Sequence, residues 1–151
     1  RLPALSDQAA HALTFGFDDE TRPTNVAISL VRHIHREMGE GAILIFMSGW
    51  GPIDALCSKL RKLPEAASLK IYQLHGSMPM SQQRGIFEKP ADPRVRKVVV
   101  STNIAESSIT IEDVVYVIDF GKRKEKTYDA ATDTSCLLES WVSRASARQR
   151  C

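Results

Sequence analysis

The chain has 151 residues, of which 43% are hydrophobic and 25% are charged, and its formal net charge is +2. These values are typical of one soluble globular domain with its own core, and so small a charge neither requires nor excludes a polyanionic partner. The three widely spaced cysteines (Cys57, Cys136 and Cys151) argue against a disulfide scaffold or a zinc site, and no apolar run is long enough to span a membrane.

The first third of the chain predicts an irregular segment, a helix and a strand. Residues 1–23 carry two prolines and an acidic triplet, and we expect them to be irregular. Thr24 and Asn25 offer a helix N-cap, and apolar residues then recur at helical spacing until Gly39 ends the segment. Residues 42–47 are a short apolar run bounded by glycines, which is typical of a strand covered on both faces.

The middle of the chain alternates helices with strands. Pro52 suits the first turn of a helix, and residues 81–87 predict a second, shorter helix. Further apolar runs predict strands at 69–74, 95–101 and 114–119. Strands that alternate with helices predict an α/β fold with a mainly parallel sheet and helices on both faces.

The last third of the chain has a different pattern. The runs KRKEKTYD and SCLLESWV flank a turn-like AATDT, which predicts a β-hairpin that extends from the sheet. The run SRASARQR then begins a helix. The basic residues of the hairpin allow two interpretations, a phosphate-binding stripe and a solvated strand face.

Three polar turns follow predicted strands: Ser48-Gly49, His75-Gly76-Ser77 and the run from Ser101 to Ser108. In open α/β sheets ligands bind beyond the carboxyl ends of the strands, so we expect these turns to converge on a binding edge. No G-x-x-x-x-G-K-[ST] loop occurs, so this domain alone cannot be a P-loop ATPase.

Four ordered motifs carry a resemblance to a known family. They are AILIFMSGW, LHGSMPMSQQRGIFEKP, VVVSTNIAESSITIEDVVYVIDFGK and SWVSRASARQR. They resemble motifs IV, IVa and V and the run into motif VI of the second RecA-like domain of DEAH/RHA-type superfamily 2 RNA helicases. The resemblance implies that residues 24–151 form this domain, a RecA-like three-layer α/β sandwich that is incomplete at its C-terminal end. Motif VI stops after Gln149-Arg150-Cys151, so we expect a fragment of a longer helicase.

The resemblance implies a path for the RNA backbone along the binding edge. Backbone N–H groups and short hydroxyls suit phosphate oxygens, because they fix position without reading bases. The positions that match the RNA contacts of the family are Ser48, Gly49, Gly76, Ser77, Thr102 and Asn103. For each single residue a helix cap or a satisfied strand end is the alternative interpretation.

The resemblance also implies a nucleotide site. Phe87 matches the ring that stacks on adenine, with ordinary core packing as the alternative. Ser107 lies toward the nucleotide, and Glu112 matches a position near the ribose, with a solvated carboxylate as its alternative. Gln149 opens motif VI and matches a catalytic position at the γ-phosphate side.

For the full-length enzyme the resemblance implies ATP or another NTP as substrate and Mg²⁺ held mainly by the first RecA-like domain, with neither bound to the isolated chain. The implied partners are single-stranded or partly structured RNA and the other helicase domains of the same protein. The implied activity is 3′ to 5′ unwinding in the nucleus or the cytoplasm, and we expect none from the isolated chain. A non-catalytic RNA-binding scaffold and a DNA-directed helicase are the alternatives.

Overall fold

The computed structural model describes residues 21–76, 78, 80–107, 109–129 and 134–150. In chain order its elements are α2 (Thr21–Glu37), β1 (Ala42–Phe46), α3 (Trp50–Leu60), a 3-10 helix η1 (Pro64–Ser68), β2 (Leu69–Leu74), α4 (Met80–Phe87), β3 (Arg96–Ser101), α5 (Ile104–Ser107), β4 (Val114–Asp119), β5 (Lys122–Asp129), β6 (Thr134–Trp141) and α6 (Arg144–Arg150). The predicted strands are found within one residue of their expected bounds, and the predicted hairpin is found as β5 and β6.

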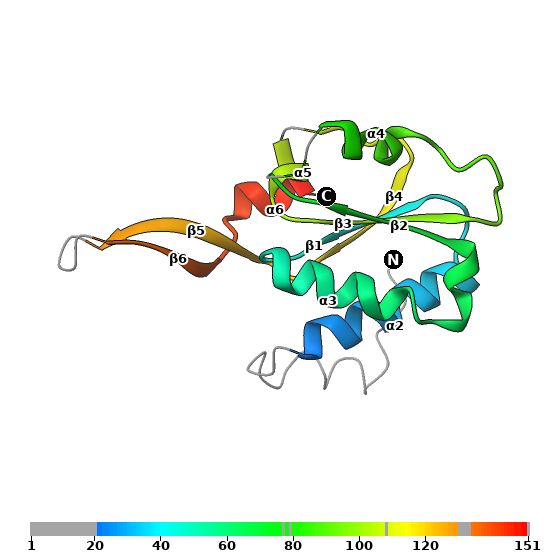
Figure 1. Cartoon of the computed structure of the whole chain (residues 1–151), viewed down its shortest axis with the longest axis horizontal. Helices are drawn as coiled ribbons and strands as arrows, with labels where there is room; N and C mark the ends of the chain where they lie inside the picture. The colour runs from blue at the N-terminus through cyan, green and yellow to red at the C-terminus, as the bar shows by residue number, and fades with distance from the viewer. Residues whose placement is uncertain (1–20, 77, 79, 108, 130–133, 151) are drawn as a thin grey trace.

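Strands β1 to β4 form one parallel sheet with the order β2-β3-β1-β4. Helices α2 and α3 lie on one face of the sheet, and α4 and α5 lie on the other (Figure 1). The predicted RecA-like α/β architecture, with helices on both faces of a parallel sheet, is confirmed.

The sheet separates two apolar clusters because successive side chains of a strand point to opposite faces. In β1, Ile43 and Ile45 pack with α2 and α3, whereas Leu44 and Phe46 pack with Ile86 of α4. All five residues of β1 are buried, as the continuous apolar run predicts for a strand covered on both faces.

The N-cap prediction at Thr24 and Asn25 is wrong. Helix α2 already includes Thr21, so the predicted irregular segment does not extend to residue 23, and residues 1–20 lie outside the described part of the chain. Thr24 is only 4% exposed and lies inside the helix. Pro23 is compatible with this earlier start, because a proline in the first turn gives up no hydrogen bond within the helix.

The hairpin leaves the body of the molecule directly after β4 and projects beyond the carboxyl ends of the sheet strands (Figure 1). Gly121 makes the turn between them with a positive φ of 69°, which favours glycine. Its N–H donates to Oδ1 of Asp119 at 2.8 Å, and its carbonyl accepts from Val142 N at 2.8 Å. The base of the hairpin is therefore fixed to the end of β4.

Among the described residues, no helix is long and apolar enough to cross a membrane.

Candidate functional site

The polar turns converge at the carboxyl edge of the sheet, as the sequence predicts. The strands end in register, with Ser101 opposite both Phe46 and Leu74. Met47 N donates to Ser101 O at 2.8 Å, and Thr102 N donates to Leu74 O at 3.2 Å. These bonds hold the turns after β1, β2 and β3 side by side, although they lie up to 55 residues apart in the sequence. Ser77 lies outside the described residues.

The turn after β3 leads directly into the short helix α5. The carbonyls of Thr102 and Asn103 accept from Ala105 N and Glu106 N at 3.4 and 3.0 Å. The Thr102 side chain is half-buried and that of Asn103 is exposed. The two residues thus lie directly before α5, whose N–H groups their backbone carbonyls accept, and Asn103 is exposed at the edge. Ser107 is the last residue of α5.

Contacts between rings and small residues join the three turns. Trp50, which begins α3 after Gly49, places its ring 4.5 Å from the ring of His75 in an edge-on contact. A Cβ at Gly76, next along the chain, would lie 3.9 Å from Cδ1 of Ile104 in α5. Gly76 itself is exposed, so its backbone is open to a ligand at this edge.

The hairpin lies against the Ser48-Gly49 turn. A Cβ at Gly49 would lie 3.3 Å from Cδ and 3.6 Å from Nζ of Lys124, so a basic residue of β5 approaches this turn. Hydrogen bonds from Ser48 and from Lys122 hold the pKa of Glu139 in β6 below its ordinary value. The convergent edge therefore continues onto the base of the hairpin.

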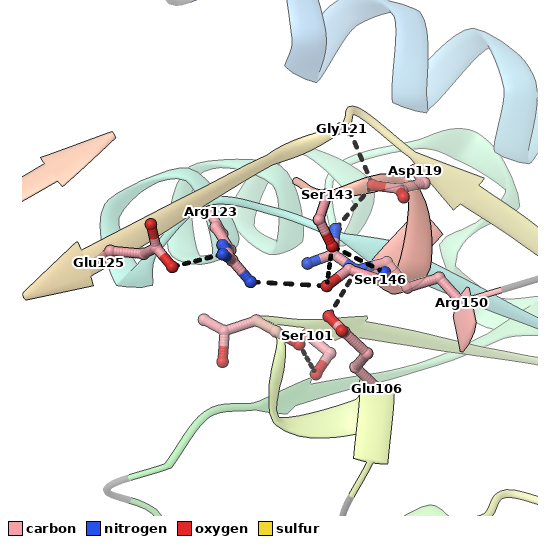
Figure 2. A network of polar contacts seen from close by, with 10 residues as sticks. Ser101, Glu106, Asp119, Gly121, Arg123, Glu125, Ser143, Ser146 and Arg150 are labelled. Atoms are coloured by element: carbon pink, nitrogen blue, oxygen red, sulfur yellow. Dashed lines mark hydrogen bonds and ion pairs between the residues drawn. The ribbon is translucent and has the colours of Figure 1, made fainter. Parts of the chain in front are cut away.

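Arg150 is the centre of a buried ionic network at the same edge (Figure 2). Its Nε donates to Oε2 of Glu106 at 3.0 Å and its Nη1 to Oδ1 of Asp119 at 2.9 Å. Its guanidinium carbon lies 4.6 Å from the centroid of the Phe46 ring. One side chain of α6 thus joins α5 and the ends of β1 and β4.

The network favours the ionised form of Glu106. Burial acts first and would raise the pKa of this carboxyl. Hydrogen bonds from Ser146 and Arg150, with the charges of Arg150 and Arg123, outweigh burial and hold the pKa of Glu106 below its ordinary value. Arg123 also approaches Ser146, with Nη1 3.5 Å from Oγ, and pairs with Glu125 (Figure 2). The network therefore reaches the hairpin as well.

Gln149, the predicted catalytic residue, is exposed on α6 beside the buried Arg150. Neighbouring residues of a helix point in different directions, so one anchors the helix and the other faces solvent. The sequence reasoning missed Arg150 and Asp119. A buried arginine and an acidic residue at a strand end are separate features of the sequence, and only the fold brings them together.

Phe87 and Glu112 lie at the opposite edge, beside the amino ends of β3 and β4. Phe87 is 51% exposed at the end of α4, so the alternative that it packs in the core is wrong. Glu112 is exposed in the turn before β4, as its solvated alternative requires. Between the two residues lies the ammonium of Lys97, the second residue of β3, whose side chain is fully buried.

The predicted nucleotide residues therefore form two groups. Phe87 and Glu112 lie at the amino edge of the sheet, and Ser107 and Gln149 lie at its carboxyl edge. Strand β3 has six residues, so the edges are about 17 Å apart at a rise of about 3.3 Å per residue.

Three further features of the described residues are their possible metal ligands, a cavity and a buried thiol. Within the described ranges, no group of three or more His, Cys, Asp or Glu side chains could hold a metal ion. A cavity of about 320 Å³ at the amino edge is lined by residues that include Arg94, Arg96 and Val115, and by none of the predicted site residues. Burial raises the pKa of the Cys57 thiol to about 11, so this cysteine is a packed and protonated side chain.

The fold is that of a RecA-like domain whose polar turns lie together at the carboxyl ends of a parallel sheet. Residues 26–146 match the helicase conserved C-terminal domain family. The chain therefore belongs to this family, in the form found in DExH-box RNA helicases of the DEAH type.

Three relatives illustrate the match. The chain is 52% identical over 123 residues to the DExH-box ATP-dependent RNA helicase DExH1 of Arabidopsis thaliana, which covers 80% of this chain and 12% of the relative. It is 47% identical over 164 residues to DExH3 of the same plant, and the match covers 99% of this chain and 14% of that relative. It is 45% identical over 135 residues to the ATP-dependent DNA/RNA helicase DHX36 of Mus musculus, and the match covers 88% of this chain and 13% of that relative. The chain thus spans about one eighth of the length of these relatives.

Proposed function

We propose that this chain is the half of an ATP-dependent RNA helicase that binds the RNA backbone at the carboxyl edge of its sheet and ATP along the face covered by α4 and α5. RNA would contact Ser48, Gly49, Gly76, Ser77, Thr102 and Asn103. Adenine would stack on Phe87, the ribose would approach Glu112, and the terminal phosphate would lie toward Ser107 and Gln149. The relatives are named as ATP-dependent helicases, which supports the overall activity.

The observation that carries this proposal is the buried Arg150 network. Glu106 lies three residues after Asn103, which would contact RNA. Arg150 directly follows Gln149, which would face the terminal phosphate. The 3.0 Å contact between Glu106 and Arg150 links the two sides rigidly. A change at the phosphate end would therefore be transmitted to the RNA turn through one ion pair, which would couple hydrolysis to movement along RNA in the 3′ to 5′ direction.

The chemistry assigned to this chain is positioning and charge stabilisation, as in phosphoryl transfer generally. Mg²⁺ would neutralise phosphate charge, and it would be held mainly by residues of the first RecA-like domain. The isolated chain would bind single-stranded RNA weakly, with strong salt dependence, and would not hydrolyse ATP.

Steady-state ATP hydrolysis by the full-length protein, with and without single-stranded RNA, tests the proposal. We expect strong stimulation by RNA in the wild type and its loss in Gln149→Ala, with Arg148→Ala, an exposed neighbour on α6, as the matched control. Hydrolysis absent in every condition would favour a non-catalytic RNA-binding scaffold. Equal stimulation by single-stranded DNA would favour a protein that acts on both nucleic acids, as the name of the DNA/RNA helicase DHX36 says of that relative.

A further inference from the structure

The ammonium of Lys97 holds the two residues on either side of Phe87. Its Nζ donates to the carbonyl of Ile86 at 2.7 Å and to the carbonyl of Glu88 at 3.2 Å. Carbonyls in the last turn of a helix lack partners within the helix. Lys97 therefore caps α4 at the point where the helix carries its exposed ring.

The same ammonium also holds the turn that carries Glu112. Nζ of Lys97 lies 2.6 Å from Oδ1 of Asp113. The carbonyl of Asp113 accepts from Ala42 N at 2.8 Å, which ties this turn to β1 as well. One cation thus connects the chain at Phe87 with the chain at Glu112.

A lysine at this place is costly unless it has a specific task. Its side chain is fully buried, and an ammonium moved out of water loses much hydration energy. Three partners use all three of its N–H donors, so the buried charge is fully satisfied. An apolar side chain of similar length would fill the same space without loss of hydration, but it could not hold a helix end and a turn in one fixed arrangement.

We propose that Lys97 is a positioning residue that fixes the distance between the base-stacking ring of Phe87 and the ribose-facing carboxylate of Glu112. The inference rests on the proposed function and adds a residue that touches neither ATP nor RNA. Without the ammonium, the end of α4 and the turn before β4 would move independently. Binding of the nucleoside would then weaken, whereas binding of the phosphates, at the other edge of the sheet, would not.

Calorimetric titration of the full-length protein with ADP and with inorganic tripolyphosphate tests this. Lys97→Met is expected to raise the Kd of ADP roughly three- to tenfold, a part of what a lost aromatic stack costs, and to leave the Kd of tripolyphosphate unchanged. Lys70→Met is the matched control. Lys70 lies beside Lys97 on β2, in register with it, but is exposed, so both dissociation constants are expected to stay at the wild-type values.

Phe87→Ala separates this inference from the proposed function. It is expected to raise the Kd of ADP about tenfold by itself. In the Phe87→Ala background, Lys97→Met should then have a smaller effect than in the wild type, because the two residues act through one contact.

Three results would overturn the inference. If Phe87→Ala weakens ADP binding and Lys97→Met does not, the positioning role is wrong and the proposed stacking stands. If Lys97→Met weakens ADP and tripolyphosphate equally, its role is general stability. If Phe87→Ala has no effect, the proposed stacking fails and the inference fails with it. Should Lys97→Met not fold, Asp113→Asn replaces it, with the same expected and contradicting results, because it removes the charged partner and keeps the shape.

Discussion

Two buried cations hold opposite edges of one sheet, and they do so differently. Arg150 at the carboxyl edge pairs with two carboxylates, those of Glu106 and Asp119. Lys97 at the amino edge pairs with one carboxylate, that of Asp113, and two backbone carbonyls. The arginine joins elements through side chains alone, whereas the lysine holds the main chain on both sides of Phe87. The arrangement around Arg150 suits a link between the proposed phosphate end and the proposed RNA turn. The arrangement around Lys97 suits a fixed support for the end of α4 and the turn before β4.

The largest effect is expected for loss of the arginine. Arg150→Met in the 151-residue chain leaves Glu106 and Asp119 largely buried without their common partner, and we expect a loss of about 3–5 kcal/mol in the free energy of unfolding. Urea denaturation measures this loss. Arg148→Met on the same helix is exposed and should change stability little. Equal stability of the two variants would show that the network is not a structural link.

A smaller loss is expected at the other edge. Lys97→Met leaves one carboxylate, where Arg150→Met leaves two, together with two backbone carbonyls without their partner, and we expect a loss of about 2–3 kcal/mol in the free energy of unfolding. The same denaturation series gives the value, with Lys70→Met as control. A loss as large as that of Arg150→Met would remove the difference between the two edges.

The carboxyl edge is expected to respond to acid through Glu106. The pKa of Glu106 is lowered in the folded chain, so its contribution to stability is complete above the ordinary carboxyl pKa of about 4.3 and is lost as the pH falls through the lowered value. We expect the stability advantage of the wild type over Glu106→Gln to shrink as the pH drops below about 4.3. Urea denaturation at a series of pH values measures it. A constant difference down to pH values near 2 would contradict the assignment.

The smallest effect concerns the hairpin. Gly121→Ala places a Cβ on a residue with φ of 69°, which costs roughly 1–2 kcal/mol. Gly51→Ala is the opposite case, since Gly51 lies in α3 with open space around its Cβ position, and it should stabilise by about 0.5–1 kcal/mol. Thermal unfolding of the two variants should shift in opposite directions. An unchanged or raised unfolding midpoint in Gly121→Ala would show that the turn at Gly121 tolerates a side chain.

The sheet was predictable because its strands are continuous apolar runs whose length and order leave few alternatives. The start of α2 was not, since Thr24 has the side chain of a cap but lies buried within the helix. The convergence of Ser48, Gly76 and Asn103 followed from the rule that parallel strands end at one edge.

The two cations escaped sequence reasoning for a physical reason. Arg150 and Glu106 are 44 positions apart in the sequence. In the sequence, Lys97 is only one of the charged residues at the start of a strand, and its partners on α4 and before β4 are brought to it by the fold. Burial of a charge depends on tertiary packing, which local patterns do not contain. The same holds for the separation of the residues predicted to bind nucleotide between two edges of the sheet.

The most direct test of the account is the RNA concentration that gives half-maximal stimulation of ATP hydrolysis by the full-length protein. It should be compared between the wild type and the double variant Thr102→Ala with Asn103→Ala. Ser29→Ala is the control, because Ser29 is exposed on α2, on the face of the sheet opposite to α5. The account predicts that the double variant needs several times more RNA, whereas the control needs as much as the wild type. An unchanged RNA requirement in the double variant would contradict the central claim that RNA binds the carboxyl edge of the sheet.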